Sequence, residues 1–89
     1  MEQRLIELVR DYQDERANLL GGRIPEFRET PLRRFAKLNG HRYPEYVLDD
    51  GRLSAAISEA RAAGEIIPPR NGRRDEYLML RADSERSPS

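Results

Sequence analysis

The sequence contains no cysteine and only one histidine, His41, in 89 residues. A chain without cysteine forms no disulfide and offers neither a thiol nucleophile nor a thiolate metal ligand. With one imidazole it also lacks the histidine clusters of common metal sites and catalytic triads. These absences exclude most metal and triad chemistry. We expect His41, which stands between Gly40 and Arg42, to be a loop or capping residue.

Long hydrophobic runs are missing as well. The mean hydropathy is -0.87, and no apolar stretch approaches the roughly 20 residues that cross a bilayer. Residues 1–20 alternate charged and apolar side chains, a pattern that does not fit a secretory signal. We therefore expect a cytoplasmic protein without membrane contact. Because no Walker loop, GxGxxG motif or nucleophile elbow occurs, we expect no enzymatic activity, and we expect no cofactor and no metal.

Charge is balanced overall but unevenly distributed along the chain. The net charge is +0, yet residues 21–42 hold six cations against two acids and residues 69–82 hold four against two. Fifteen of the sixteen cations are arginine, the better bidentate ligand for phosphate and guanine. The two basic segments are compatible with an anionic partner, although a GC-rich genome would produce the same excess of arginine.

The first 20 residues predict an amphipathic helix over residues 2–20. Its apolar residues recur every three or four positions. They are Leu5, Leu8, Val9, Tyr12, Leu19 and Leu20. Gly21 and Gly22 end the helix, and Pro25 makes residues 24–27 an extended connector or a very short edge strand. The apolar side of this helix is larger than a short helix needs for internal packing. A homodimer that forms through this side is therefore compatible with the sequence. The residues of that contact would be Leu5, Leu8, Val9 and Leu19.

A second, basic helix is predicted over residues 30–38. Thr30 can cap it and Pro31 suits its first position, whereas Asn39 and Gly40 end it. Its expected buried residues are Leu32, Phe35, Ala36 and Leu38, and its basic residues are Arg33, Arg34 and Lys37. The basic residues are either the polar side of an amphipathic helix or contacts to phosphate. Residues 41–48 predict an irregular loop or one helical turn.

A third helix is predicted over residues 52–63, before Gly64. Asp49 and Asp50 are capping candidates, which we prefer to a catalytic or magnesium-binding carboxylate pair. A spacing of 100° per residue places Leu53, Ala56, Ile57 and Ala60 on the buried side and Ser54, Ala55, Ser58, Glu59 and Ala62 on the other.

Two strands, at residues 66–67 and 77–80, should flank a basic turn and form a β-hairpin. Tyr43, Tyr46 and Tyr77 could stack on bases, but in a domain this small we expect them in the core. Residues 82–89 show no apolar periodicity, and we expect them to be disordered.

Three helices followed by a hairpin with a basic tip resemble a winged helix-turn-helix domain over residues 30–81. The stretch GRLSAAISEARAAGEII is similar to the recognition helix of winged-helix regulators. Such helices place apolar residues where Leu53, Ile57 and Ala60 stand, and they end in Ala-Gly-x-Ile. RNGRRDEYLML resembles the wing that follows. The resemblance implies an α+β fold, with three helices and a C-terminal β-hairpin wing forming a single domain over residues 1–81.

Two features depart from that pattern. The interval between Asn39 and Gly51 is about three times a tight helix-helix turn, which takes roughly 3–4 residues. The exposed side of residues 52–63 also offers small residues and Glu59, where a strong base reader would offer Arg, Asn or Gln. Direct readout of bases should therefore be limited.

Our leading hypothesis is a small protein that binds duplex DNA, either as a transcriptional regulator or as an accessory factor of a phage, plasmid or chromosome. The residues expected at the DNA come from the second helix, the third helix and the hairpin tip: Arg33, Arg34, Arg52, Ser54, Ser58, Arg70, Asn71, Arg73 and Arg74. The alternative is a protein-interaction adaptor or small inhibitor with the same fold. The small Ala and Ser side chains of the third helix would let another helix approach closely, and the net charge of +0 favours this alternative.

Overall fold

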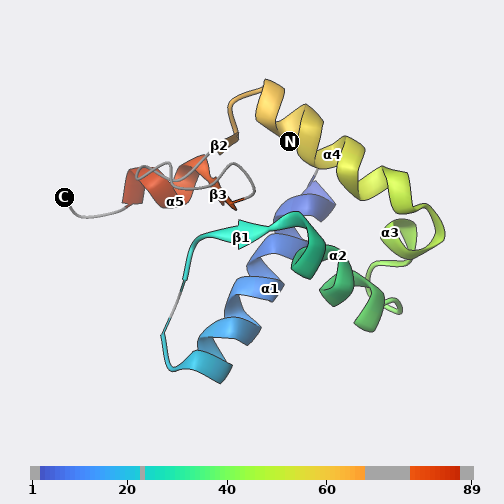
Figure 1. Ribbon diagram of the computed structural model, residues 1–89, viewed down its shortest axis with the longest axis horizontal. Helices are drawn as coiled ribbons and strands as arrows, with labels where there is room; N and C mark the ends of the chain where they lie inside the picture. The colour runs from blue at the N-terminus through green and yellow to red at the C-terminus, as the bar shows by residue number, and fades with distance from the viewer. Residues whose placement is uncertain (1–2, 23, 68–76, 87–89) are drawn as a thin grey trace.

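The computed structural model describes residues 3–22, 24–67 and 77–86 (Figure 1). These residues form helices and strands in the order α1 (Gln3–Leu20), β1 (Phe27–Arg28), α2 (Glu29–Leu38), α3 (Pro44–Leu48), α4 (Asp50–Ala62), β2 (Ile66–Ile67), β3 (Tyr77–Leu80) and α5 (Arg81–Arg86). Helices predominate over a small antiparallel sheet, so the fold is α+β, as the sequence predicts. The described part of the chain contains five helices, where the sequence predicts three. None of these helices has the length and apolar character needed to cross a membrane.

The sheet has the strand order β1-β3-β2, and both pairings are antiparallel. Ile66 lies opposite Leu80 and Ile67 opposite Met79, which confirms the predicted pair of strands. On the other side of β3, Phe27 lies opposite Leu78. Of the predicted connector or edge strand over residues 24–27, only Phe27 belongs to the strand, which extends to Arg28. The connection between β2 and β3 lies outside the described residues. The predicted tip residues Arg70, Asn71, Arg73 and Arg74 belong to it.

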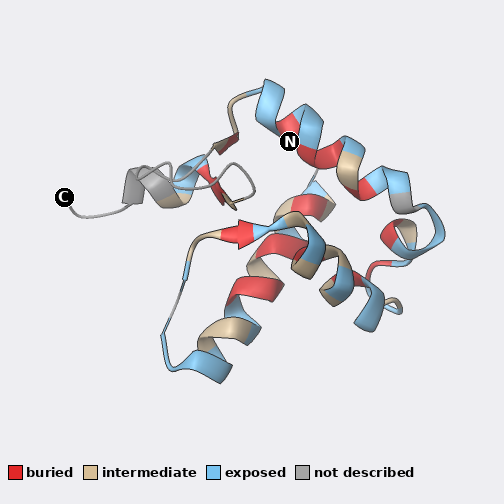
Figure 2. Cartoon of the chain, viewed as in Figure 1, coloured by how far each residue is buried: buried red, intermediate tan, exposed pale blue. Residues whose placement is uncertain are grey.

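Helix α1 supplies one wall of the core. Leu5, Leu8 and Val9 are fully buried, and Tyr12 is nearly so. Gly21 ends the helix with a φ of 75°, a left-handed conformation that glycine adopts without steric cost. Leu19 and Leu20, which continue the predicted apolar stripe, are exposed, because both lie in the last turn, which projects beyond the other helices (Figure 2).

The expected homodimer contact through α1 is not available to three of its four residues. Leu5, Leu8 and Val9 have no exposed surface because they pack inside their own chain. Only Leu19 remains accessible, at 77% exposure.

Helix α2 begins one residue before its predicted start. Arg28 is its N-cap and makes no capping hydrogen bond through its side chain, so the predicted cap at Thr30 is wrong because β1 leads directly into the helix. Pro31 remains in the first turn, where its missing N–H has no helical acceptor. Leu38 is exposed rather than buried, because it lies about 120° around the helix from the buried Leu32.

The interval between α2 and α4 contains the short helix α3, so of the two predicted alternatives it is the helical turn that forms rather than an irregular loop. Pro44 is at its N-terminal position, and Tyr43 and Tyr46 are buried as expected. Helix α3 packs against both α2 and α4, so the interval that is too long for a tight turn forms a packed element of its own. Tyr77, the third tyrosine expected in the core, is only half-buried.

Helix α4 starts two residues before its predicted start, with Asp49 as its N-cap. The Asp49 carboxylate accepts a hydrogen bond of 3.0 Å from the backbone N–H of Gly51, which confirms the capping role. All four predicted core residues of α4 are buried: Leu53, Ala56, Ile57 and Ala60.

The expectation that residues 82–89 are disordered is wrong for residues 82–86, which continue as α5. Asp83 forms an ion pair of 2.7 Å with Arg10 and accepts a hydrogen bond of 3.0 Å from the side chain of Gln13. Both partners belong to α1. The ion pair with Arg10, which is far away in the sequence, therefore holds residues 82–86 in place, although these residues have no apolar periodicity.

Candidate nucleic-acid interface

The exposed side of α4 carries only small and charged side chains. Ala55, Ser58, Glu59 and Ala62 are exposed, as the helical spacing predicts. Two arginines, Arg52 and Arg61, are exposed in the first and last turns of the same helix. The helix therefore presents a narrow, largely non-hydrophobic surface with a cation near each end.

Two of the residues expected at DNA contact one another instead. Arg33 is half-buried and donates a hydrogen bond of 2.5 Å to the carboxylate of Glu29. Arg33 also donates to the hydroxyl of Ser54, and this hydroxyl donates to Glu29 at 2.6 Å. The cluster joins the start of α2 to the start of α4. Arg33 and Ser54 are thus occupied in joining α2 to α4, and we leave them out of the proposed DNA contact.

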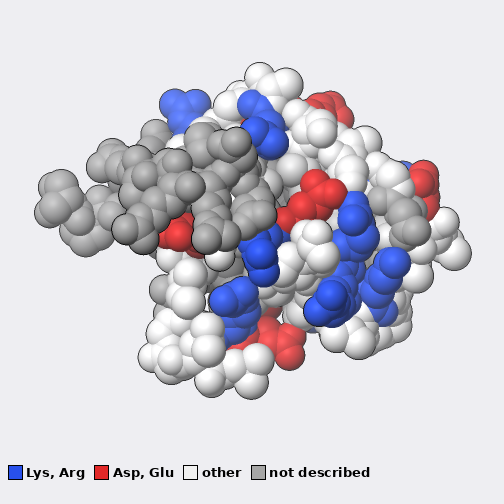
Figure 3. All heavy atoms as spheres, viewed as in Figure 1, with Lys and Arg blue, Asp and Glu red and all other residues white. Residues whose placement is uncertain are grey.

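The other predicted residues of α2 and α4 keep exposed side chains. Arg34 and Lys37 are exposed on α2, as are Arg52 and Ser58 on α4. On the face shown in Figure 3, Lys and Arg side chains gather over α2, with acidic side chains beside them. Arg34 pairs with no charged side chain in the described part of the chain.

A cleft of about 460 Å³ opens beside Arg34, with two arginines that the sequence reasoning missed, Arg28 and Arg61. The full lining is Arg28, Glu29, Thr30, Pro31, Arg34, Arg61 and Leu78. Arg61 could have been found, because it follows Ser58 by three positions and therefore lies on the same side of α4. Arg28 could not, since nothing local to it indicates that α4 lies nearby.

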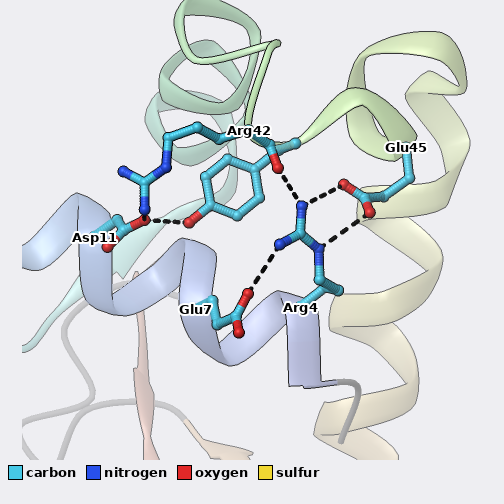
Figure 4. A network of polar contacts seen from close by, with 6 residues as sticks. Arg4, Glu7, Asp11, Arg42 and Glu45 are labelled. Atoms are coloured by element: carbon cyan, nitrogen blue, oxygen red, sulfur yellow. Dashed lines mark hydrogen bonds and ion pairs between the residues drawn. The ribbon is translucent and has the colours of Figure 1, made fainter.

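A second cleft, of about 560 Å³, lies along α1 and has a different character. Its cations are Arg4, Arg10 and Arg42, and each is paired with a carboxylate. Arg4 bonds Glu7 at 2.9 Å and Glu45 at 3.1 Å, and Arg42 bonds Asp11 at 2.9 Å (Figure 4). Arg10 bonds Asp83. These charges hold helices together, so they leave little positive potential for a ligand.

The same network raises the pKa of Arg4 and shifts the pKa values of Glu45 and Tyr43. Hydrogen bonds from Arg4 hold the pKa of the Glu45 carboxyl below its usual value, with a smaller contribution from the charge of Arg52. Burial, followed by the hydrogen bond to Asp11, raises the pKa of Tyr43 to about 12. Both groups are fixed in the protonation state that they already have at neutral pH, which is typical of structural residues rather than of acid-base catalysts.

The described residues contain no group of His, Cys, Asp and Glu side chains that could hold a metal ion. His41 is exposed in the turn after α2, a position that fits a loop residue. Comparison of the chain with protein-family models, curated proteins and solved structures found no match.

Proposed function

We propose that this protein binds duplex DNA, with α4 in the major groove and the β2–β3 connection against the adjacent backbone. The order of elements supports this proposal. Helix α4 ends at Ala62 with Ala63 as its C-cap, Gly64 follows with a φ of 78°, and the antiparallel pair β2 and β3 comes next. This is the arrangement expected of a winged helix, with α3 as an additional element before α4.

The observation that carries the proposal is the exposed side of α4. Thirteen residues make a helix about 20 Å long, and an α-helix fits into a major groove about 12 Å wide. The small side chains of Ala55, Ser58 and Ala62 would permit a close approach of α4 to the bases. The opposite side of α4 is anchored in the core by Leu53 and Ile57.

Within this arrangement, Arg52 and Ser58 face base edges, and Lys37 of α2 faces the backbone. Arg70, Asn71, Arg73 and Arg74 of the β2–β3 connection contact phosphates or the minor groove. Because only one hydroxyl and one guanidinium of α4 would face bases, base readout is limited, and DNA shape contributes most of the specificity. The protein would act in the cytoplasm by occupying a site, as a regulator or accessory factor without catalytic activity.

The test is fluorescence anisotropy with a random duplex at two salt concentrations. We expect the affinity to fall steeply with salt, because each phosphate contact contributes about 0.9 to the logarithmic slope. Arg52→Gln should weaken binding. The control Arg81→Gln removes the same charge next to the end of β3 that is distant from the β2–β3 connection, and it should leave binding unchanged. A protein that binds no duplex at low salt, or an Arg52→Gln variant that binds as the parent does, contradicts the proposal.

The alternative, a protein-interaction adaptor or small inhibitor, is favoured by a different observation. Leu38 at the end of α2 and Leu48 at the end of α3 are 78% and 87% exposed. The two leucines end helices that pack against each other, and covering apolar side chains of this kind would favour a protein partner. The salt titration separates the two functions, because an adaptor shows no DNA binding at either salt concentration.

A further inference from the structure

We infer that the cleft between β1, α2 and α4 is a binding site for a phosphomonoester. Three arginines from three segments line it: Arg28 next to the start of α2, Arg34 in α2 and Arg61 in α4. The site shares Arg61 with the exposed side of α4, but it includes neither Arg52 nor Ser58, the two residues of α4 that the proposed function places at base edges. The inference does not depend on the proposed binding of duplex DNA.

Two of the three cations of this cleft, Arg34 and Arg61, are available to a ligand. Neither Arg34 nor Arg61 pairs with a charged side chain among the described residues. The guanidinium of Arg28 lies 5.6 Å from the centre of the Tyr77 ring, on the neighbouring strand, which restricts the positions it can adopt. In the cleft along α1, by contrast, every arginine is paired with a carboxylate.

The one acidic residue in the lining is already occupied. Oε2 of Glu29 accepts hydrogen bonds from Arg33 at 2.5 Å and from Ser54 at 2.6 Å. The remaining excess of positive charge matches a phosphomonoester, which carries about −1.5 to −2 at neutral pH and has three acceptor oxygens. A backbone phosphodiester carries a single charge. Guanidinium groups suit this ligand because they bind phosphate oxygens through two parallel hydrogen bonds.

The size of the cleft indicates that the phosphate is attached to a larger group. A volume of about 460 Å³ lies within the range of roughly 300–1,000 Å³ for small-molecule sites. Pro31 and Leu78 form an apolar part of the lining, which suits a sugar or a base. A nucleotide 5′-phosphate has this combination of groups, either as a free mononucleotide or at the 5′ end of a nucleic acid.

The test uses adenosine 5′-monophosphate as the probe, with adenosine and the methyl diester of the same nucleotide as matched controls. Binding is followed by titration calorimetry and by the NMR shifts of the arginine Nε–H groups of the full chain. We expect the monoester to bind at least about tenfold more tightly than the methyl diester. Arg34→Gln and Arg61→Gln should each weaken its binding about tenfold or more.

Arg81→Gln, which removes a charge outside the cleft, should leave the affinity for the monoester unchanged. Circular dichroism and thermal melting establish that the variants fold. Equal affinities for the monoester and the methyl diester overturn the inference, and so does unchanged binding by the Arg34→Gln and Arg61→Gln variants.

Two further ligands separate the sources of the phosphate and keep the two proposals distinct. If a 5′-phosphorylated short duplex binds more tightly than its 5′-hydroxyl counterpart, the ligand is a nucleic-acid end. If only the free nucleotide binds through the cleft, the ligand is a small molecule. A covalently closed circular duplex, which has no ends, tests the proposed DNA-binding function alone.

Discussion

The hydroxyl of Tyr43 donates a hydrogen bond to the carboxylate of Asp11, which joins the segment after α2 to the middle of α1 (Figure 4). Arg42 pairs with the same carboxylate, and the guanidinium groups of Arg4 and Arg42 lie 4.9 and 5.7 Å from the centre of the Tyr43 ring. The segment between α2 and α4, which takes the place of a tight helix-helix turn, is therefore held in position by contacts with α1. Helix α3 lies in this segment and packs against α4.

Tyr43 should make the stability of the protein depend on alkaline pH. Its pKa is raised from 10.0 to about 12, first by burial and then by the bond to Asp11. A raised pKa in the folded state contributes stability that is fully present below pH 10 and is lost as the pH rises towards 12. Urea unfolding at several pH values should show this loss in the parent and a flatter profile in Tyr43→Phe. Identical alkaline profiles would show that Tyr43 ionises as an ordinary tyrosine.

Glu45 should have the opposite effect at acid pH. Hydrogen bonds from Arg4 lower its pKa below the ordinary value of 4.5. The stabilisation is therefore present above about pH 4.5 and is lost as the pH falls through the folded-state pKa. Glu45→Gln should be less stable than the parent at neutral pH, and the difference should shrink on acidification. A difference that stays constant down to about pH 3 would contradict a charge-dependent contact.

The two sides of α4 should respond differently to truncation. Ile57 is 2% exposed, and replacing a buried isoleucine by alanine costs about 2–4 kcal/mol. Ser58 is exposed, so Ser58→Ala should change the free energy of unfolding by less than about 0.5 kcal/mol. Thermal and urea unfolding of both variants measure the contrast. Equal destabilisation by the two changes would mean that α4 is rotated from the orientation described.

Much of the fold follows from local sequence signals. The spacing of Leu53 and Ile57 predicts the buried side of α4, and Asp49 predicts the cap at its start. Gly21 and Gly64 predict the ends of two helices through their left-handed conformation. The errors lie at the ends of elements: Leu38 and Leu19 continue an apolar pattern into final turns that no neighbour covers. Local periodicity does not show which turns of a helix are covered by neighbouring elements.

The site was less predictable, because its residues come together through distant contacts. Ser54 and Glu29 are 25 positions apart and hydrogen-bonded, and nothing near either residue in the sequence indicates this bond. The same holds for Arg28 and Arg61, which line one cleft from β1 and α4. Solvent exposure could be predicted from helical spacing, whereas the partner of each charge could not.

The cluster of Glu29, Arg33 and Ser54 should stabilise the protein without reading bases. Ser54→Ala removes one donor and one acceptor of this half-buried cluster, and we expect it to cost about 1 kcal/mol. The sequence preference for DNA should not change, because Ser54 is occupied within the protein. Urea unfolding together with binding to a set of different duplexes tests both statements. A changed preference at unchanged stability would return Ser54 to the reading surface.

Glu59 should weaken the proposed binding of DNA. It is exposed on the same side of α4 as Ala55 and Ala62, so its carboxylate would approach the phosphates when α4 lies in the major groove. Among base edges in the major groove, a carboxylate can accept only from the amino groups of cytosine and adenine. Glu59→Gln keeps the shape and removes the charge, and we expect severalfold tighter binding to a random duplex. The gain should be larger at low salt, where charges are less screened.

The matched control for Glu59→Gln is Glu15→Gln, which removes an exposed carboxylate from α1. If α4 lies in the groove, anisotropy titrations should show a much smaller gain for Glu15→Gln, because its charge acts from a greater distance. Equal gains would mean that only the net charge matters and that α4 does not enter the groove. If neither variant binds more tightly although the parent binds DNA, another surface carries the binding.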